Sequence, residues 1–138
     1  MIKNNRTFPA VRRFRRGVAT LEFALCLPML ALLVFGSIEA ASFIFLKQSL
    51  QVAAYEGIRE AIRAGSQDTT SVNRSMAILN SRLINNANVR FASGSAATAT
   101  RGEQVVIEVS APTRTNSPLA GQWIANRTLT ARLVMLKE

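Results

Sequence analysis

The sequence predicts an α+β protein in which a long N-terminal helix is followed by a second short helix and a small antiparallel sheet. Three observations predict this fold. An apolar run covers Val18–Leu46, helical periodicity continues from it to Ala64, and apolar residues alternate with polar ones in the last third of the chain. With 138 residues, the chain has room for one membrane segment and one small domain.

Residues 1–17 form a basic leader that ends on Gly17. The leader holds six of the 17 Lys+Arg residues and no acidic one, so the remaining 11 against 8 Asp+Glu leave a net charge of +3 out of +9. The excess positive charge therefore lies directly before the apolar run, where the positive-inside rule places the cytoplasmic side. Because the other basic residues lack an aromatic-interleaved patch, we expect no nucleic-acid partner.

The apolar run 18–46 is long enough to be a transmembrane helix, which needs about 20 residues at ~1.5 Å each. The apolar run is longer than the apolar core of a secretory signal peptide, and it continues into a helical pattern. We therefore interpret it as a membrane span that is not itself removed from the chain. Pro28 is expected to bend this helix. Two pairs of small residues have the four-residue spacing that lets helices approach closely in lipid: Gly36 with Ala40, and Ser37 with Ala41.

The helix is predicted to continue outside the membrane over 47–65 and to end at Gly65. Its apolar stripe comprises Leu46, Leu50, Ala53, Gly57, Ala61 and Ala64. An external α+β domain is expected over 66–138. Its helix should cover Thr70–Asn86, capped by Asp68 or Thr69, with one apolar face made of Val72, Met76, Leu79 and Leu83. Its strands should cover Val89–Ala92, Gln104–Ser110 and Leu129–Leu136.

The composition argues against an enzyme. Without histidine the chain cannot form a Ser-His-Asp triad or a histidine metal ligand. The single cysteine, Cys26, cannot form an intramolecular disulfide and is interpreted as a small apolar filler. We therefore expect no catalytic residue, no metal and no cofactor. Trp123 is expected to pack in the core or at a sheet edge, with a surface contact as the alternative.

Two carboxylates, Glu22 and Glu39, lie in the apolar run, where a charge costs roughly 2.5–3.5 kcal/mol at the helix centre. Glu39 follows Val18 by ~32 Å of helix, near the outer boundary of a ~30 Å hydrocarbon core. We interpret it as an interfacial carboxylate that marks the end of the span, with a partner contact as the alternative. Glu22 could reach the cytoplasmic headgroups or pair with another subunit.

Several features of the first helix occur together in a fixed order. A glycine precedes the apolar run, a carboxylate and a phenylalanine follow it closely, and a proline and a Gly-x-x-Glu end complete the pattern: Gly17, Glu22-Phe23, Pro28 and Gly36–Glu39. This pattern, over about residues 15–64, resembles the TadE-like proteins, pilin-like components of the tight-adherence (Tad, or Flp) pilus system of bacteria. The resemblance implies that prepilin peptidase cuts between Gly17 and Val18. It also implies that Glu22 meets the free amine of Val18 of a neighbouring subunit.

The resemblance implies a minor pilin or pseudopilin that supports pilus biogenesis and surface adherence. The implied location is the bacterial inner membrane, with a cytoplasmic N-terminus, a periplasmic C-terminal domain and incorporation into a surface pilus as a further step. The implied partners are prepilin peptidase, other pilin-like subunits, the Tad assembly machinery and membrane lipid. Two alternatives stay open: an uncleaved single-span anchor with an envelope-binding external domain, and a pseudopilin of a type II secretion system.

Overall fold

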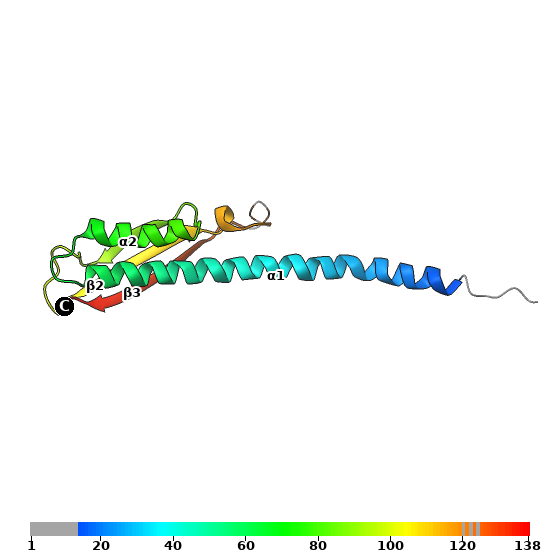
Figure 1. Cartoon of the computed structure of the whole chain (residues 1–138), viewed down its shortest axis with the longest axis horizontal. Coiled ribbons are helices and arrows are strands. Elements are labelled where there is room, and N and C mark those ends of the chain that lie inside the picture. Colours follow the sequence, from blue (N-terminus) through cyan, green and yellow to red (C-terminus); the bar gives the residue numbers. More distant parts are fainter. Residues whose placement is uncertain (1–13, 120, 122, 124) are drawn as a thin grey trace, which may run out of the picture. The chain divides into compact units, whose positions relative to one another are not determined.

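The computed structural model describes residues 14–119, 121, 123 and 125–138, with side chains from residue 17 on. Its elements are the helices α1 (Phe14–Ala61) and α2 (Asp68–Ser81), the strands β1 (Asn88–Ser93), β2 (Gln104–Pro112) and β3 (Thr128–Leu136), and the 3₁₀ turn η1 (Arg114–Asn116) (Figure 1). The predicted α+β fold is confirmed. Residues 1–13, most of the predicted leader, lie outside the described residues.

The chain divides into two units, 1–37 and 38–138, and α1 contributes residues to both. In the first unit, α1 begins at Phe14, four residues before the predicted start, and continues through Pro28 without a break. The second unit begins at Ile38, so residues 38–46, which we assigned to the membrane span, belong to the second unit.

The second unit is built around a three-stranded antiparallel sheet with the order β1-β2-β3. The predicted alternation in β2 is confirmed on its inner face, where Val105, Ile107 and Val109 are fully buried. Neighbouring strands extend this face, because Ile107 lies opposite Phe91 on β1 and Leu133 on β3. On the outer face, Glu108 pairs with Arg90 at 2.8 Å. The sheet therefore has one face in the core, while its outer face is only partly open to solvent, because Val106 there is 4% exposed.

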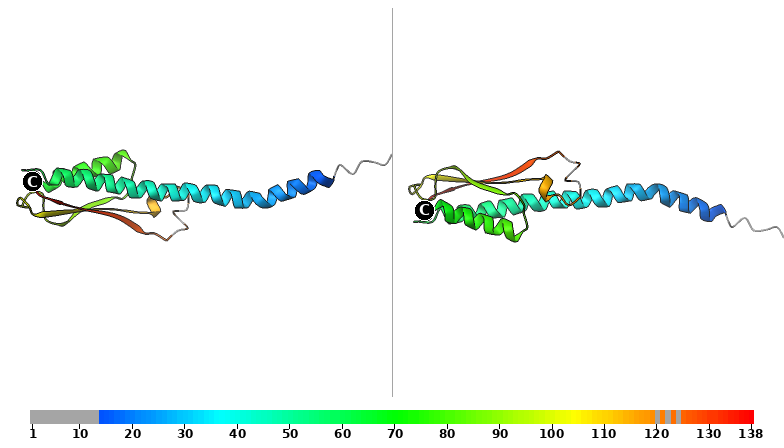
Figure 2. Two further views of the ribbon diagram at one scale, coloured as in Figure 1. Left: turned by 90° about the horizontal axis from the view of Figure 1, so that it is seen from below. Right: turned by 90° about the horizontal axis from the view of Figure 1, so that it is seen from above.

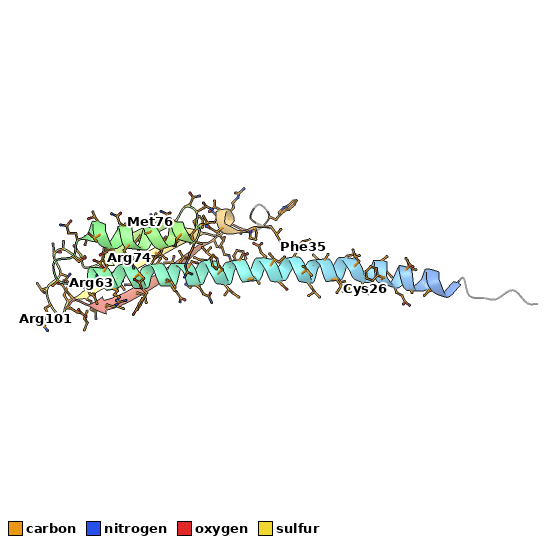
Figure 3. The ribbon with its side chains drawn as sticks, in the orientation of Figure 1. Cys26, Phe35, Arg63, Arg74, Met76 and Arg101 are labelled. Atoms are coloured by element: carbon orange, nitrogen blue, oxygen red, sulfur yellow. The ribbon has the colours of Figure 1, made fainter. Side chains whose placement is uncertain are left out.

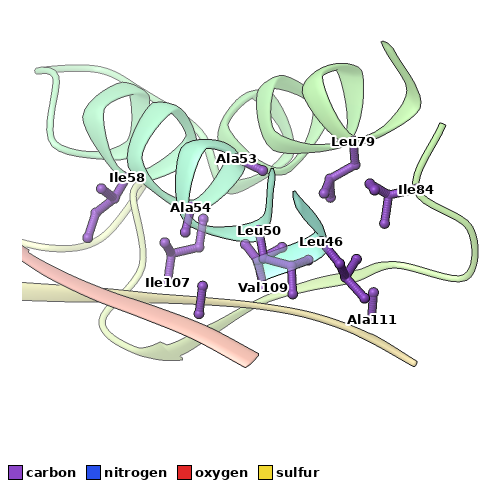
Figure 4. Packing of buried hydrophobic residues seen from close by; sticks show 11 residues of the cluster. Leu46, Leu50, Ala53, Ala54, Ile58, Leu79, Ile84, Ile107, Val109 and Ala111 are labelled. Carbon is purple, nitrogen blue, oxygen red and sulfur yellow. The ribbon is translucent and has the colours of Figure 1, made fainter. Parts of the chain in front are cut away.

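The two helices of the second unit cover the inner face of the sheet (Figure 2). The core combines residues of α1, α2 and β2, and Figure 4 shows their side chains meeting: Leu46, Leu50, Ala54, Ile58, Leu79, Ile107 and Val109. Five of the six residues in the predicted stripe of α1 are buried, whereas Ala64 is exposed. Ala64 lies beyond the end of α1, which is at Ala61.

A glycine allows α1 and α2 to pack closely. A Cβ atom at Gly57 would lie 1.9 Å from Ser75 Oγ and 3.0 Å from Ile107 Cδ1, so no side chain fits there without movement. Ser75 Oγ donates a hydrogen bond to the carbonyl oxygen of Ala53 at 2.9 Å. This contact joins the two helices through a polar group whose hydrogen bond is satisfied inside the core.

The second helix ends at Ser81, five residues before the predicted end. Leu83 has a φ of 57°, and the bonds Leu83 N–H to Asn80 O and Ile84 N–H to Leu79 O form a Schellman motif. Ile84 therefore enters the core, while Leu83, predicted to face it, is 82% exposed. The predicted cap was also wrong: Gln67 occupies the N-cap, and Asp68 accepts a hydrogen bond from the Ala96 N–H instead.

The end of α1 is held by Lys137, a contact that sequence reasoning missed. The Lys137 ammonium is buried and donates hydrogen bonds to the carbonyl oxygens of Ala61, Arg63 and Ala96, at 2.7, 2.8 and 2.7 Å. A positive charge at a helix C-terminus also interacts favourably with the helix dipole. The main chain adds a hydrogen bond from the Glu138 N–H to Ile62 O at 3.1 Å. The C-terminal residues thus fasten the sheet to α1.

The prediction for Trp123 was wrong. Its side chain is 90% exposed and packs neither in the core nor at a sheet edge. Trp123 lies in the connection 113–127 between β2 and β3, which closes at its base through the bonds Thr113 N–H to Arg127 O and Arg127 N–H to Thr113 Oγ1. Because the hydrogen-bonded strands end on either side of this connection, no strand position is available for the indole.

Candidate functional site

The predicted cleavage position, Gly17, lies in α1 and is exposed. A Cβ atom at Gly17 would meet no atom within 4 Å, in contrast to Gly57, where Ser75 blocks it. Packing within the described chain therefore gives no reason for a glycine at position 17. A requirement for glycine there would have to come from another molecule, such as a protease that binds extended backbone in a narrow site.

The carboxylate of Glu22 lies on an exposed helix surface, and the side chains of Val18 and Phe23 beside it are exposed too. A carboxylate among apolar side chains is stable in lipid only when headgroups or an opposite charge compensate it. Because α1 here is not covered by other described residues, that compensation has to come from outside the part of the chain that the structure describes. Both interpretations of Glu22, headgroup contact and pairing with a second subunit, remain predictions.

The first unit exposes far more apolar surface than a soluble monomer does. Within α1, Gly17–Ala61 is long and apolar enough to cross a membrane, and its most apolar window has no buried residue. Side chains such as Cys26 and Phe35 project from the helix (Figure 3). An apolar surface of this size needs lipid or other apolar helices to cover it, so the helix is compatible with a single-pass membrane anchor.

The predicted helix-packing residues are accessible to a partner. Gly36, Ala40 and Ala41 are exposed, and a Cβ atom at Gly36 would meet nothing within 4 Å. Ser37 Oγ donates a hydrogen bond to Leu33 O at 2.7 Å, so its hydroxyl is satisfied within the helix. The predicted close approach of another helix, and the role of Pro28 in it, stay predictions.

Glu39 differs in its surroundings from Glu22. Its side chain is 7% exposed, and the Ser117 hydroxyl donates a hydrogen bond to Glu39 Oε1. This contact joins α1 to the connection between β2 and β3 within the second unit. Sequence reasoning missed Ser117 because the two residues are 78 positions apart and no pattern links them. The assignment of Glu39 to the outer membrane boundary stays a prediction.

The described residues contain no group of three or more His, Cys, Asp or Glu side chains that could hold a metal ion. Three carboxylates of the second unit instead form ion pairs with basic residues: Glu56 with Arg74, Glu60 with Arg63 and Glu108 with Arg90. Three exposed or half-exposed pairs of this kind contribute little to stability. The expected lack of catalytic activity stays a prediction.

The comparison with protein families matches the first helix. Residues 17–59 match the model of the TadE-like protein family. The match begins at the predicted cleavage glycine, ends inside α1, and leaves α2 and the sheet outside it. No curated protein and no solved structure matches the chain.

Proposed function

Because residues 17–59 match the TadE-like protein family, we propose that the chain is a pilin-like, membrane-anchored component of a Tad/Flp pilus assembly system. The family match associates the chain with Tad pili in general. In the proposed function, the chain is a minor pilin or pseudopilin that supports pilus biogenesis and surface adherence. It is non-enzymatic, its N-terminus is cytoplasmic, and its second unit is periplasmic.

The observation that carries the proposal is the start of the family match at Gly17, directly before the apolar part of α1 that no other described residue covers. Prepilin peptidase would remove residues 1–17, including six basic residues. The new N-terminus is the amine of Val18. Removing the basic leader would make the mature chain easier to transfer from the bilayer into a helical assembly, because fewer charges have to leave the cytoplasmic surface.

In the assembled state, Glu22 would pair with the amine of Val18 of the next subunit. Each charge alone is costly among apolar helices, and an ion pair compensates both. Since both partners occur once per subunit, the pair would define the axial register between subunits. Glu22→Gln should therefore leave leader removal intact but abolish incorporation into pili, whereas Glu22→Asp should retain part of it. Normal incorporation of Glu22→Gln would exclude the pairing role.

Intact mass of the membrane-extracted chain tests the cleavage. Expressed with an active prepilin peptidase, the chain should begin at Val18, and with an inactive peptidase it should keep its leader. Gly17→Phe should keep the leader under both conditions. Gly36→Phe is the matched control, because Gly36 also has open space around it, and this variant should be cleaved normally. A full-length chain in every sample would favour the uncleaved single-span anchor.

A pseudopilin of a type II secretion system would give the same masses. Deletion of the gene distinguishes the two systems: loss of Flp pili with normal protein secretion supports the Tad assignment. Loss of secreted proteins with normal pili would replace it by the secretion pseudopilin.

A further inference from the structure

The second unit carries apolar side chains that its core does not use, at the end where α1 enters it. We call these residues the apolar collar: Ile38, Phe45, Leu83, Leu119 and Trp123. They come from α1, from the turn after α2 and from the connection between β2 and β3. Trp123 and Leu83 are the most exposed large apolar side chains among the described residues. A cluster of this kind marks a surface that contacts something outside the domain.

Hydrogen bonds hold the three segments of the collar together. Asn116 Oδ1 accepts a hydrogen bond from the Asn85 N–H at 2.8 Å, and Asn116 Nδ2 donates to Asn85 O at 3.0 Å. This pair joins the β2–β3 connection to the turn that bears Leu83. The bond from Ser117 to Glu39 joins the same connection to α1. The collar is therefore one surface of defined shape.

Two neighbouring grooves make the collar continuous. Ile38, Phe45 and Leu83 line one groove of about 590 Å³, and Leu119 and Trp123 line the next. Both grooves share Ser117 and Pro118. The connection turns back tightly before Trp123, because a Cβ atom at Gly121 would lie 2.4 Å from Arg114 O. The Trp123 side chain itself is 90% exposed.

The charged side chains at this end are mostly basic. Four of them lie on the segments that bear the collar: Lys47, Arg82, Arg114 and Arg127. Within the stretches 38–47 and 82–85 and the described residues of 113–127, Glu39 is the single acidic residue, and it is buried and hydrogen-bonded. Basic side chains near an anionic lipid surface gain ~1 kcal/mol each. The positive charge of these side chains therefore complements the negative charge of lipid phosphates.

We propose that the apolar collar rests on the surface of the membrane that holds α1, with Leu119 and Trp123 at the boundary between headgroups and acyl chains. A ~30 Å hydrocarbon core takes about 20 helical residues, so a span that starts at Val18 ends near Ile38, the first residue of the collar. Tryptophan is enriched at this depth because its ring is apolar and its N–H is polar. The inference rests on the proposed membrane anchoring of α1.

Trp123 is the one tryptophan of the chain, so its fluorescence reports on the collar. The full chain is reconstituted in nanodiscs of phosphatidylcholine and phosphatidylglycerol, with one copy per disc. Quenching by aqueous iodide is compared with quenching by lipids brominated near the headgroup or near the chain end. We expect Trp123 to be quenched several-fold less by iodide than free tryptophan, and more by shallow than by deep bromine. Full iodide access without lipid quenching overturns the proposal.

A double variant, Trp123→Phe with Tyr55→Trp, is the matched control. Tyr55 is exposed on α1 in the second unit, ~24 Å beyond Glu39 at 1.5 Å per residue. Its tryptophan should be open to iodide and insensitive to brominated lipid. Equal lipid quenching at positions 55 and 123 would overturn the proposal, because the collar would then not be the part in contact.

Two further readouts separate the possible failures. Protection of Trp123 that appears only with several copies per disc would assign the collar to a second copy and overturn the lipid contact. A chain that co-elutes with discs while Trp123 stays open to iodide would overturn the collar and leave the anchoring intact. A chain that does not co-elute with discs would overturn both.

Discussion

Replacing Gly57 by alanine tests how closely α1 and α2 pack. The new Cβ atom would lie 1.9 Å from Ser75 Oγ, so the hydroxyl or the helices must move. Movement of the hydroxyl breaks its 2.9 Å bond to Ala53 O, at a cost of about 1 kcal/mol. Overpacking adds roughly 1–3 kcal/mol. The gain in helix propensity from glycine to alanine, about 1 kcal/mol, offsets part of this.

The expected net loss in the free energy of unfolding is therefore about 1–3 kcal/mol for Gly57→Ala. For a domain of about 100 residues, this corresponds to a decrease in Tm of roughly 4–8 °C per kcal/mol. Thermal unfolding of the full chain in mild detergent, followed by circular dichroism, measures the decrease. Gly36→Ala is the matched control, because a Cβ atom there meets nothing within 4 Å. This control should not lower Tm.

A double-mutant cycle with Ser75→Ala identifies the cause of the loss. Ser75→Ala removes the atom that the new Cβ would meet, and the nearest remaining atom is Ile107 Cδ1 at 3.0 Å. The double variant should therefore be about as stable as Ser75→Ala alone, with a coupling energy of about 1 kcal/mol or more between the two sites. Additive losses, or a Gly57→Ala variant as stable as the wild type, would refute the reasoning.

Three further predictions concern single side chains. Lys137→Met should lower the free energy of unfolding by about 3 kcal/mol, because three carbonyl oxygens lose a charged donor; an unchanged urea midpoint would contradict this. Leu83→Gly should raise stability by about 1 kcal/mol, since Leu83 has a φ of 57°; a lower Tm would show that its side chain stabilises the fold. Glu39→Leu should increase hydrogen exchange in the connection 113–127, since Ser117 loses its acceptor; unchanged exchange there would show that the bond does not order the connection.

Elements with a regular apolar pattern could be predicted from the sequence. The alternation in β2 and the stripe Leu46–Ala61 in α1 both report which side chains lose contact with water, and both were found with nearly correct bounds. The cleavage segment stays a prediction, and it could be made because a glycine, a carboxylate and an apolar run are neighbours in sequence. Patterns among residues that are close in sequence can be recognised without knowledge of the tertiary structure.

Contacts between distant residues could not be predicted. Lys137 and the carbonyl oxygens of α1 are more than 70 positions apart, and Ser117 and Glu39 are 78 apart. A lysine near a chain end and a serine in a polar loop look like solvent-exposed residues until the fold brings their partners close. The end of α2 was missed for a related reason, since a leucine rarely occupies the left-handed position that usually takes glycine.

The buried ammonium of Lys137 determines where this protein can be labelled. A purification tag fused after Glu138 would follow directly on a residue whose N–H donates a hydrogen bond to Ile62 O. It would also lie next to Lys137, whose buried ammonium donates a hydrogen bond to Ala61 O. A tag before Met1 would be discarded with the leader if the proposed cleavage occurs. The exposed loop residues Ala97 and Thr98 offer a better insertion point, so an epitope placed there would stay on the chain after the proposed cleavage.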